Sequence, residues 1–183
     1  MTSSPNIVSS HPLPPVGRCH RLGGVGGGIC LPGSRVAWVA ALSPRLATII
    51  DALPLRPGLR VVEIGCGPGA AAREVANRVG PRGHVLAIDR SEKAIAQLTE
   101  SAAELMAAKR LTARQVAAEA LELEPGEERY DIAFAVRVGA FDGRHPRAGS
   151  QALERLGHVL VPGGRLFIDG GNPLREVTVP VLR

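Results

Sequence analysis

Short apolar runs alternate with longer amphipathic segments along most of the chain. The runs at 60–64, 84–88 and 130–138 are rich in residues that favour strands, and the segments 70–79 and 91–109 repeat apolar residues at helical spacing. Strands that alternate with helices of this length form a mostly parallel sheet with helices on both faces. The pattern therefore predicts an α/β fold with a doubly wound sheet.

Weaker patterns complete this prediction. Helical segments are expected between 34 and 53 and at about 150–160, with strands at 114–118 and 165–169. Right-handed crossovers then place the carboxyl ends of the strands along one edge of the sheet, where α/β proteins bind ligands. We predict five parallel strands in the order 3-2-1-4-5.

The first 33 residues differ from the rest of the chain. Several prolines and the glycine-rich run 23–28 interrupt any apolar periodicity, a composition typical of disordered segments. The run lacks the Gly-Lys-Ser/Thr ending of a phosphate-binding loop, which favours a flexible linker. We therefore predict a disordered leader over 1–33 and a single folded domain over 34–183.

The distribution of charge argues against a nucleic-acid partner. The net charge is +5, but residues 1–50 contain four arginines and no acidic residue, so the rest of the chain holds 18 basic residues against all 17 acidic ones. No basic run could follow a phosphate backbone. Aromatic residues, at 3%, are too few to suggest a surface on which bases stack.

Cysteine content and hydropathy bear on the compartment. The three cysteines, Cys19, Cys30 and Cys66, are odd in number and lack the spacing of metal ligands, so no metal site is expected. No apolar run approaches the roughly 18 residues of a membrane span. A reduced, cytoplasmic protein without a membrane segment is the simplest interpretation.

The most informative stretch is the apolar run at 60–64 together with the glycines that follow it. Glycines permit positive φ angles and a close approach of ligand to main chain, and the first N–H groups of the next helix suit an electron-rich group. The segment matches the dinucleotide pattern G-x-G-x-x-G/A. However, Glu63 lies inside the strand, and the third glycine falls at Gly69, which gives E-x-G-x-G-x-G.

These residues resemble the class I S-adenosylmethionine-dependent methyltransferases. Residues 63–69 are similar to the first motif of that family, and Asp89 is similar to its acidic residue at the end of the second strand. Segments 130–134 and 160–167 are similar to those that enter strands four and five. The resemblance covers about residues 35–170 and implies a Rossmann-like domain that binds S-adenosylmethionine.

The resemblance also implies roles for single residues. Glu63 would be oriented towards the ammonium of the cofactor, Asp89 would accept hydrogen bonds from both ribose hydroxyls, and Glu119 would lie near the adenine amino group. Simpler alternatives stay open, since Asp89 could cap the turn after it and Glu119 could be a solvated loop residue. The implied cofactor-binding set is Glu63, Gly65, Cys66, Gly67, Gly69, Asp89, Arg90, Glu119 and Ala120.

The C-terminal end departs from the family pattern. Family members continue past the fifth strand with a helix and an antiparallel hairpin, whereas only residues 170–183 remain here. Residues 177–181 could form one short strand, which Pro180 would confine to an edge. We therefore expect a truncated or minimal domain that lacks the hairpin, with a partly unpaired fifth strand that could support a homodimer.

Methyl transfer to a small molecule is the function that the resemblance and the charge distribution favour together. After the fourth strand lie Asp142 and His145, and imidazole is the group that ordinarily titrates near neutral pH, so His145 is the candidate base. A surface histidine before Pro146 is the alternative. The motif of nucleic-acid amino-methylating enzymes is absent after this strand. An RNA methyltransferase and an inactive cofactor-binding remnant acting through a partner remain as other hypotheses.

Overall fold

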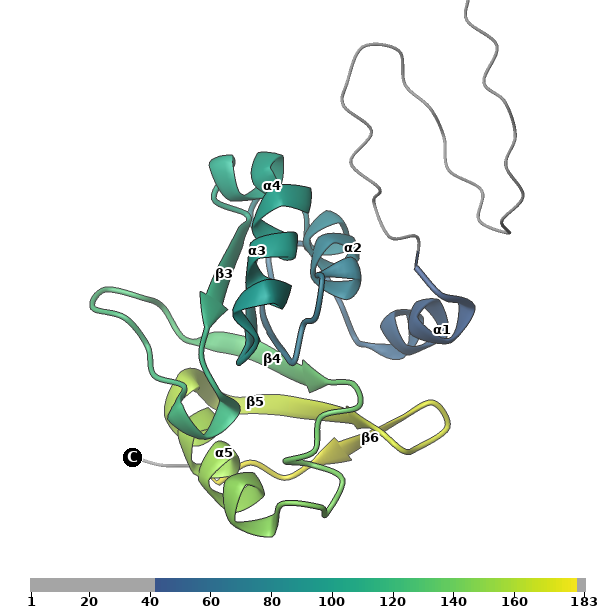
Figure 1. Cartoon of the computed structure of the whole chain (residues 1–183), viewed down its shortest axis with the longest axis vertical. Coiled ribbons are helices and arrows are strands. Elements are labelled where there is room, and N and C mark those ends of the chain that lie inside the picture. Colours follow the sequence, from purple (N-terminus) through teal and green to yellow (C-terminus); the bar gives the residue numbers. More distant parts are fainter. Residues whose placement is uncertain (1–41, 181–183) are drawn as a thin grey trace, which may run out of the picture.

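The computed structural model describes residues 42–180 (Figure 1). The predicted leader over 1–33 and the start of the predicted domain lie outside the described residues. Within the described part, the strands are β1 (Arg60–Ile64), β2 (His84–Asp89), β3 (Leu111–Gln115), β4 (Tyr130–Ala135), β5 (Leu160–Asp169) and β6 (Leu174–Val177). The helices are α1 (Pro44–Ala52), α2 (Ala70–Val79), α3 (Glu92–Ser101), α4 (Ala103–Ala107) and α5 (Pro146–Val159), with a 3-10 turn η1 (Ala118–Ala120).

One mixed sheet contains all six strands in the order β3-β2-β1-β4-β5-β6. The first five strands are parallel, which confirms the predicted order 3-2-1-4-5 and the Rossmann-like α/β class. Because all five point the same way, the turns that follow β1, β2, β3 and β4 meet at one edge of the sheet. In the described part of the chain, none of the helices is both long enough and apolar enough to cross a membrane.

Each face of the sheet has its own apolar core, because neighbouring side chains of a strand point to opposite faces. Val61 packs with side chains of α1, α2 and α3, whereas Val62 packs with those of α5 and η1. Figure 1 shows α2 and α3 on one side of β4 and β5, and α5 on the other. The predicted cover of helices on both faces is therefore present.

Local sequence explains where the helices begin. Ser43 caps α1, since its Oγ accepts a hydrogen bond from the Leu46 N–H at 3.3 Å, and a proline follows at the first helical position. Ser91 caps α3 in the same way through the Ala94 N–H at 3.3 Å. The Ser91 cap lies at the start of the segment predicted over 91–109, and α1 lies within the helical region expected between 34 and 53.

Several element boundaries differ from the predictions. The helix expected over 91–109 is divided into α3 and α4, and β3 begins three residues before the expected strand at 114–118. The strand expected at 165–169 begins earlier, at Leu160, and residues 161–164 lie inside β5, where the register against β4 shifts. Between the pairs Tyr130–Leu160 and Ile132–Arg165, this irregularity accommodates both glycines within the strand.

The expected absence of an antiparallel C-terminal hairpin is wrong. β6 pairs antiparallel with β5, with Leu166 opposite Val177 and Asp169 opposite Leu174. This strand begins three residues before the short strand that the sequence suggested at 177–181. The sheet edge at β5 is therefore covered over its last four residues, and β6 forms the outer edge.

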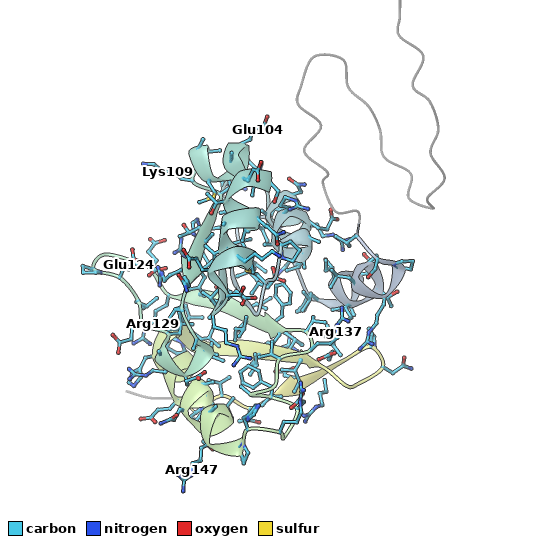
Figure 2. All side chains as sticks on the ribbon, in the orientation of Figure 1. Glu104, Lys109, Glu124, Arg129, Arg137 and Arg147 are labelled. Atoms are coloured by element: carbon cyan, nitrogen blue, oxygen red, sulfur yellow. The ribbon has the colours of Figure 1, made fainter. Side chains whose placement is uncertain are left out.

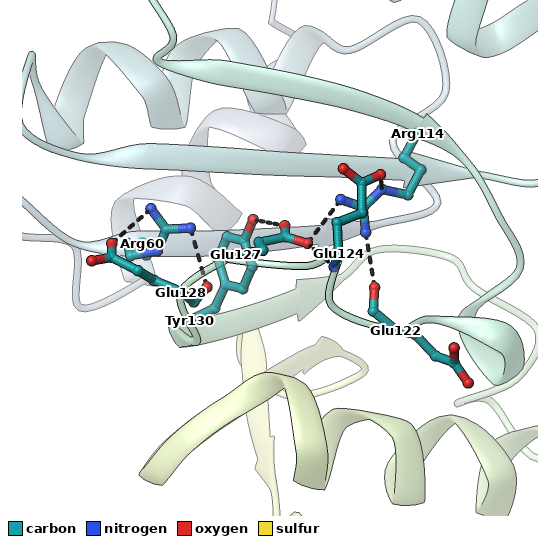
Figure 3. A network of polar contacts seen from close by, with 7 residues as sticks. All are labelled: Arg60, Arg114, Glu122, Glu124, Glu127, Glu128 and Tyr130. Atoms are coloured by element: carbon teal, nitrogen blue, oxygen red, sulfur yellow. Dashed lines mark hydrogen bonds and ion pairs between the residues drawn. The ribbon is translucent and has the colours of Figure 1, made fainter.

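A polar network holds the connection between β3 and β4 in place (Figure 3). The Tyr130 hydroxyl donates to Glu127 Oε1 at 2.6 Å, and Arg114 Nη2 donates to Glu127 Oε2 at 2.9 Å. The Arg60 guanidinium lies 4.7 Å from the centre of the Tyr130 ring. Burial raises the pKa of Tyr130 above its ordinary value, with the Glu127 hydrogen bond adding to the rise. The network fixes the segment that carries η1 and Glu119.

Candidate cofactor and acceptor site

The glycine turn, residues 65–69, is tied to the end of β2 by its backbone. The N–H groups of Gly65 and Cys66 both donate to the Ile88 carbonyl, at 2.8 and 3.0 Å. Gly65 and Gly67 have φ angles of 72° and 52°, a region that other residues rarely adopt. A Cβ at Gly67 would have no atom within 4 Å. The turn therefore presents open space at Gly67, where a ligand could approach the main chain.

Asp89 joins the glycine turn to the start of α3. Its Oδ2 accepts from the Gly67 N–H and its Oδ1 from the Ser91 N–H, each at 2.9 Å. The suggested role as a turn cap is therefore realised. Each carboxylate oxygen has two lone pairs, and Asp89 also lines the cavity described below. Both oxygens can thus accept a further hydrogen bond from a ligand.

Glu63 is a buried carboxyl directly beneath the glycine turn. The residue is 5% exposed, and its Oε2 has no hydrogen-bond partner within the described residues. Burial raises the pKa of Glu63 to about 8, and the charge of Asp89 adds to the rise. The Ala72 N–H and the Arg73 guanidinium act in the opposite direction. A buried, unsatisfied oxygen is costly, and a cationic donor from a ligand would satisfy it.

Cys66 is a turn residue rather than a nucleophile. The thiol is buried, at 6% exposure, and burial raises its pKa well above the ordinary range. The charges of Glu63 and Asp89 add to this rise. Because the thiolate is the reactive form of cysteine, the environment of Cys66 keeps the group unreactive.

A cavity of about 790 Å³ opens at the carboxyl edge of the sheet. Turns after β1, β2, β3 and β4 all contribute to its wall. Of the residues predicted for the site, those that line the cavity are Gly65, Asp89, Arg90, Glu119 and His145. The others do not line it: Glu63, Cys66 and Gly69 are buried, Gly67 is half-buried, and Ala120 is exposed on η1. Their roles in binding remain predictions.

The loop from 136 to 145, here called the β4–α5 loop, supplies residues that the sequence did not single out. Arg137 lines the cavity and has a φ of 57°, unusual for a residue other than glycine. Its N–H donates to Asp169 Oδ1 at 2.9 Å, while Asp169 Oδ2 accepts from Arg45 at 3.1 Å. The sequence analysis did not single out Arg137, because β4 was expected to continue through Val138. In the structure, β4 ends at Ala135.

His145 lies against the backbone of the β4–α5 loop. A Cβ on Gly139 would be 3.1 Å from the imidazole Cδ2, so the ring rests on that glycine. Asp142 does not orient the ring, because its carboxylate accepts from Arg144 Nε at 2.6 Å. This hydrogen bond holds the pKa of Asp142 below its ordinary range. Within residues 42–180, His145 therefore borders the cavity without a hydrogen bond to Asp142, although its charge also lowers the pKa of Asp142.

The fold and the cavity at the carboxyl edge of the sheet indicate a class of protein. Comparison with known proteins gives the same class. The chain matches the methyltransferase-domain family over residues 61–164, which run from β1 into β5. The chain therefore belongs to the class I S-adenosylmethionine-dependent methyltransferase domains. Binding of S-adenosylmethionine is typical of this family. No group of three or more potential metal-ligating side chains occurs in residues 42–180.

Curated relatives extend over much of the described sheet. Protein-L-isoaspartate O-methyltransferase of Methylorubrum populi is 38% identical over 128 residues, which cover 70% of this chain and 52% of the relative. Trans-aconitate 2-methyltransferase of Variovorax paradoxus is 30% identical over 135 residues, which cover 74% and 47%. The chain thus spans about half the length of these relatives.

A solved structure with a bound ligand has the same fold. Phosphoethanolamine N-methyltransferase 2 of Haemonchus contortus, in complex with phosphomonomethylethanolamine and S-adenosylhomocysteine, aligns with a TM-score of 0.54 and 27% identity. The alignment covers 68% of this chain and 27% of that protein. The described domain is therefore similar to part of a larger methyltransferase.

Proposed function

We propose that this chain binds S-adenosylmethionine at the glycine turn and transfers its methyl group to a small-molecule acceptor in the adjoining cavity. One observation carries the proposal: the unsatisfied carboxyl oxygen of Glu63 lies beneath a turn whose Gly67 faces open space. Such a site suits a ligand that has a cationic amino group and that comes close to the main chain. S-adenosylmethionine, when bound, supplies an ammonium for Glu63 and a methyl group on a sulfonium sulfur.

Roles for the remaining residues follow from their positions. Asp89 has unused lone pairs on both oxygens and accepts the two ribose hydroxyls. Glu119 lines the cavity from η1 and lies near the adenine amino group, with Arg90 beside the same pocket. Glycine is needed at Gly65, because a Cβ there would be 2.7 Å from Val138 Cγ2. These assignments support cofactor binding by the edge of the sheet.

Positioning of the acceptor is the main source of catalysis in this proposal. Holding two reactants in alignment can lower a barrier by up to about 7–11 kcal/mol in favourable cases. His145, on the wall formed by the β4–α5 loop, takes a proton where the acceptor atom must lose one. The cavity, at about 790 Å³, has a volume suited to small molecules.

Calorimetric titration of the purified chain tests the cofactor. S-adenosylmethionine and S-adenosylhomocysteine are expected to bind, and NAD is expected not to. The variant Glu63→Gln should weaken both sulfur ligands, while Arg82→Ala, in the turn before β2 at the opposite edge, should leave them unchanged. Binding of NAD but of neither sulfur ligand would end the proposal.

The acceptor class needs a separate measurement. Transfer of labelled methyl groups should be followed to extracts separated into small molecules, protein and RNA. Label in the small-molecule fraction is expected, because the body outside the first 50 residues is almost neutral and offers no basic run for RNA. Label confined to RNA, with salt-dependent RNA binding, would favour the RNA methyltransferase instead.

A further inference from the structure

The cavity wall carries more positive than negative charge. Four arginines line it, namely Arg90, Arg137, Arg144 and Arg147. Only two acidic residues face them, Asp89 and Glu119. Since the body as a whole is almost neutral, this excess is local to the cavity. A ligand that supplies negative charge would complement the wall.

Three of these four guanidinium groups have no partner within residues 42–180. Arg144 forms an exposed ion pair with Asp142. In contrast, the side chains of Arg90, Arg137 and Arg147 make no hydrogen bond or ion pair within residues 42–180. Arginines away from the cavity are commonly paired, as Arg114 is on β3. The unpaired donors at the cavity are available to a ligand.

Arg137 is the best placed of the unpaired arginines. Figure 2 shows Arg137 at the carboxyl end of β4, whereas Arg147, at the start of α5, points away from the body. Arg90 follows Asp89 and so lies on the side of the cavity assigned to the nucleoside. The left-handed backbone of Arg137 is held by its hydrogen bond to Asp169. Such conformations persist where the surrounding structure fixes them, and they are frequent at functional sites.

We propose that the methyl acceptor is a small anion with a carboxylate or phosphate group, and that Arg137 binds this group. The inference rests on the proposed function, since it places the acceptor beside the cofactor. A guanidinium presents a planar set of N–H donors that matches both carboxylate and phosphate. Arg144, on the same loop, can add a second contact because its pair with Asp142 is exposed and readily exchanged.

Calorimetry with two defined anions tests this proposal. Citrate and pyrophosphate are titrated into the whole chain, both free and saturated with S-adenosylhomocysteine, at one fixed low salt concentration. Saturable binding of citrate alone would assign a carboxylate acceptor, and binding of pyrophosphate alone a phosphate acceptor. Binding of both supports the shared anion chemistry. Binding of neither, with or without S-adenosylhomocysteine, would overturn the proposal.

Variants then assign the binding to Arg137. Arg137→Gln should weaken the tighter anion by about 10- to 100-fold, the effect of losing a hydrogen bond to a charged group. Arg137→Lys should retain an intermediate affinity, because it keeps the charge and loses the planar fork. The control Arg82→Ala removes one exposed positive charge at the opposite edge of the sheet and should change nothing.

Two outcomes separate this inference from the proposed function. Unchanged anion affinity in Arg137→Gln would overturn the assignment of Arg137, as would a loss of S-adenosylhomocysteine affinity without a loss of anion affinity. The latter result would place Arg137 on the cofactor. Anion binding that depends on Arg137 in a chain that fails to bind S-adenosylhomocysteine would support the anion site and refute only the cofactor proposal.

Discussion

The glycine turn and the β4–α5 loop border the same cavity but are held in different ways. In the glycine turn, the N–H groups of residues 65–67 all bond to the end of β2. Half of the residues of the β4–α5 loop are exposed, and the Arg137 N–H is anchored by one hydrogen bond to the side-chain carboxylate of Asp169. One region is fixed by main-chain hydrogen bonds, whereas the other offers side chains to solvent.

This difference suggests a division of labour. A cofactor with the same chemistry in every turnover can be recognised by main chain, whose geometry depends on glycine and on pairing between strands. In the proposed function, the acceptor is instead recognised by side chains on a loop, where substitutions alter chemistry at little cost to the fold. Changes in the glycine turn should therefore affect folding and cofactor binding together, whereas changes in the β4–α5 loop should affect the acceptor alone.

The largest expected effect is at Gly69. This residue is the N-cap of α2 and has a φ of 79°, and an added Cβ would overlap the Leu98 side chain on α3. Gly69→Ala should therefore lower the free energy of unfolding by about 2–5 kcal/mol, from backbone strain and overpacking together. Chemical denaturation at fixed pH measures this loss.

Gly126→Ala is the matched control for that substitution. Gly126 has nearly the same φ, 80°, but nothing lies within 4 Å of the added Cβ. Gly126→Ala should therefore lower the free energy of unfolding only through backbone strain, by about 1–2 kcal/mol. Equal losses at the two glycines would show that the packing of α2 against α3 does not depend on Gly69.

A second test concerns Asp89, which serves both the turn and the proposed ribose contact. Asp89→Ala should weaken S-adenosylmethionine and S-adenosylhomocysteine by about ten- to hundredfold, equivalent to roughly 1.5–3 kcal/mol. Stability should fall as well, because the N–H groups of Gly67 and Ser91 lose their acceptor. Calorimetry and denaturation report the two effects separately. Lower stability with unchanged affinity would restrict Asp89 to the turn.

The third prediction concerns the pH dependence of stability. The pKa of Glu63 is raised to about 8 in the folded chain, from an ordinary value of 4.5. Stability from this group is complete below pH 4.5, where both states are protonated, and is lost as pH rises towards 8, because only the unfolded state ionises. The expected slope is about −1.4 kcal/mol per pH unit between pH 5 and 8.

The variant Glu63→Gln isolates this contribution. Its side chain cannot ionise, so the difference in free energy of unfolding between it and the original chain should change with pH by the stated slope. The affinity for S-adenosylhomocysteine should depend on pH in the opposite direction to the stability. An ammonium that favours ionised Glu63 makes S-adenosylhomocysteine bind more tightly as pH rises to 8, with proton release measurable in buffers of different ionisation enthalpy. A pH-independent difference would remove Glu63 from this role.

The contrast between the two regions also explains what the sequence could predict. β1 and α2 were predicted with the observed bounds, 60–64 and 70–79, because apolar runs and glycines act locally. The family motif then placed Asp89 at the cavity. By comparison, β3 was predicted three residues too late, since its polar residues give only a weak strand pattern.

The missed features depend on contacts between distant residues. The conformation of Arg137 requires Asp169, 32 positions away, and β6 forms only because β5 offers an edge. No local pattern marks the conformation of Arg137, and the short strand suggested at 177–181 overlaps β6 only at Val177. The pKa of Glu63 likewise follows from burial within the finished fold. Sequence alone could therefore indicate the side of the cavity proposed for the cofactor, and it identified only His145 on the side proposed for the acceptor.

The smallest effect is expected from Asp142→Asn in the β4–α5 loop. The pair between Asp142 and Arg144 is exposed, and exposed pairs contribute little to folding. Denaturation should therefore detect no change in stability. Citrate or pyrophosphate should bind slightly more tightly, because Arg144 loses its competing partner. Glu128→Gln is the control, since it removes an exposed carboxylate paired with Arg60 at the opposite edge. A marked loss of stability in Asp142→Asn would show that this loop is held as firmly as the glycine turn, and the comparison would fail.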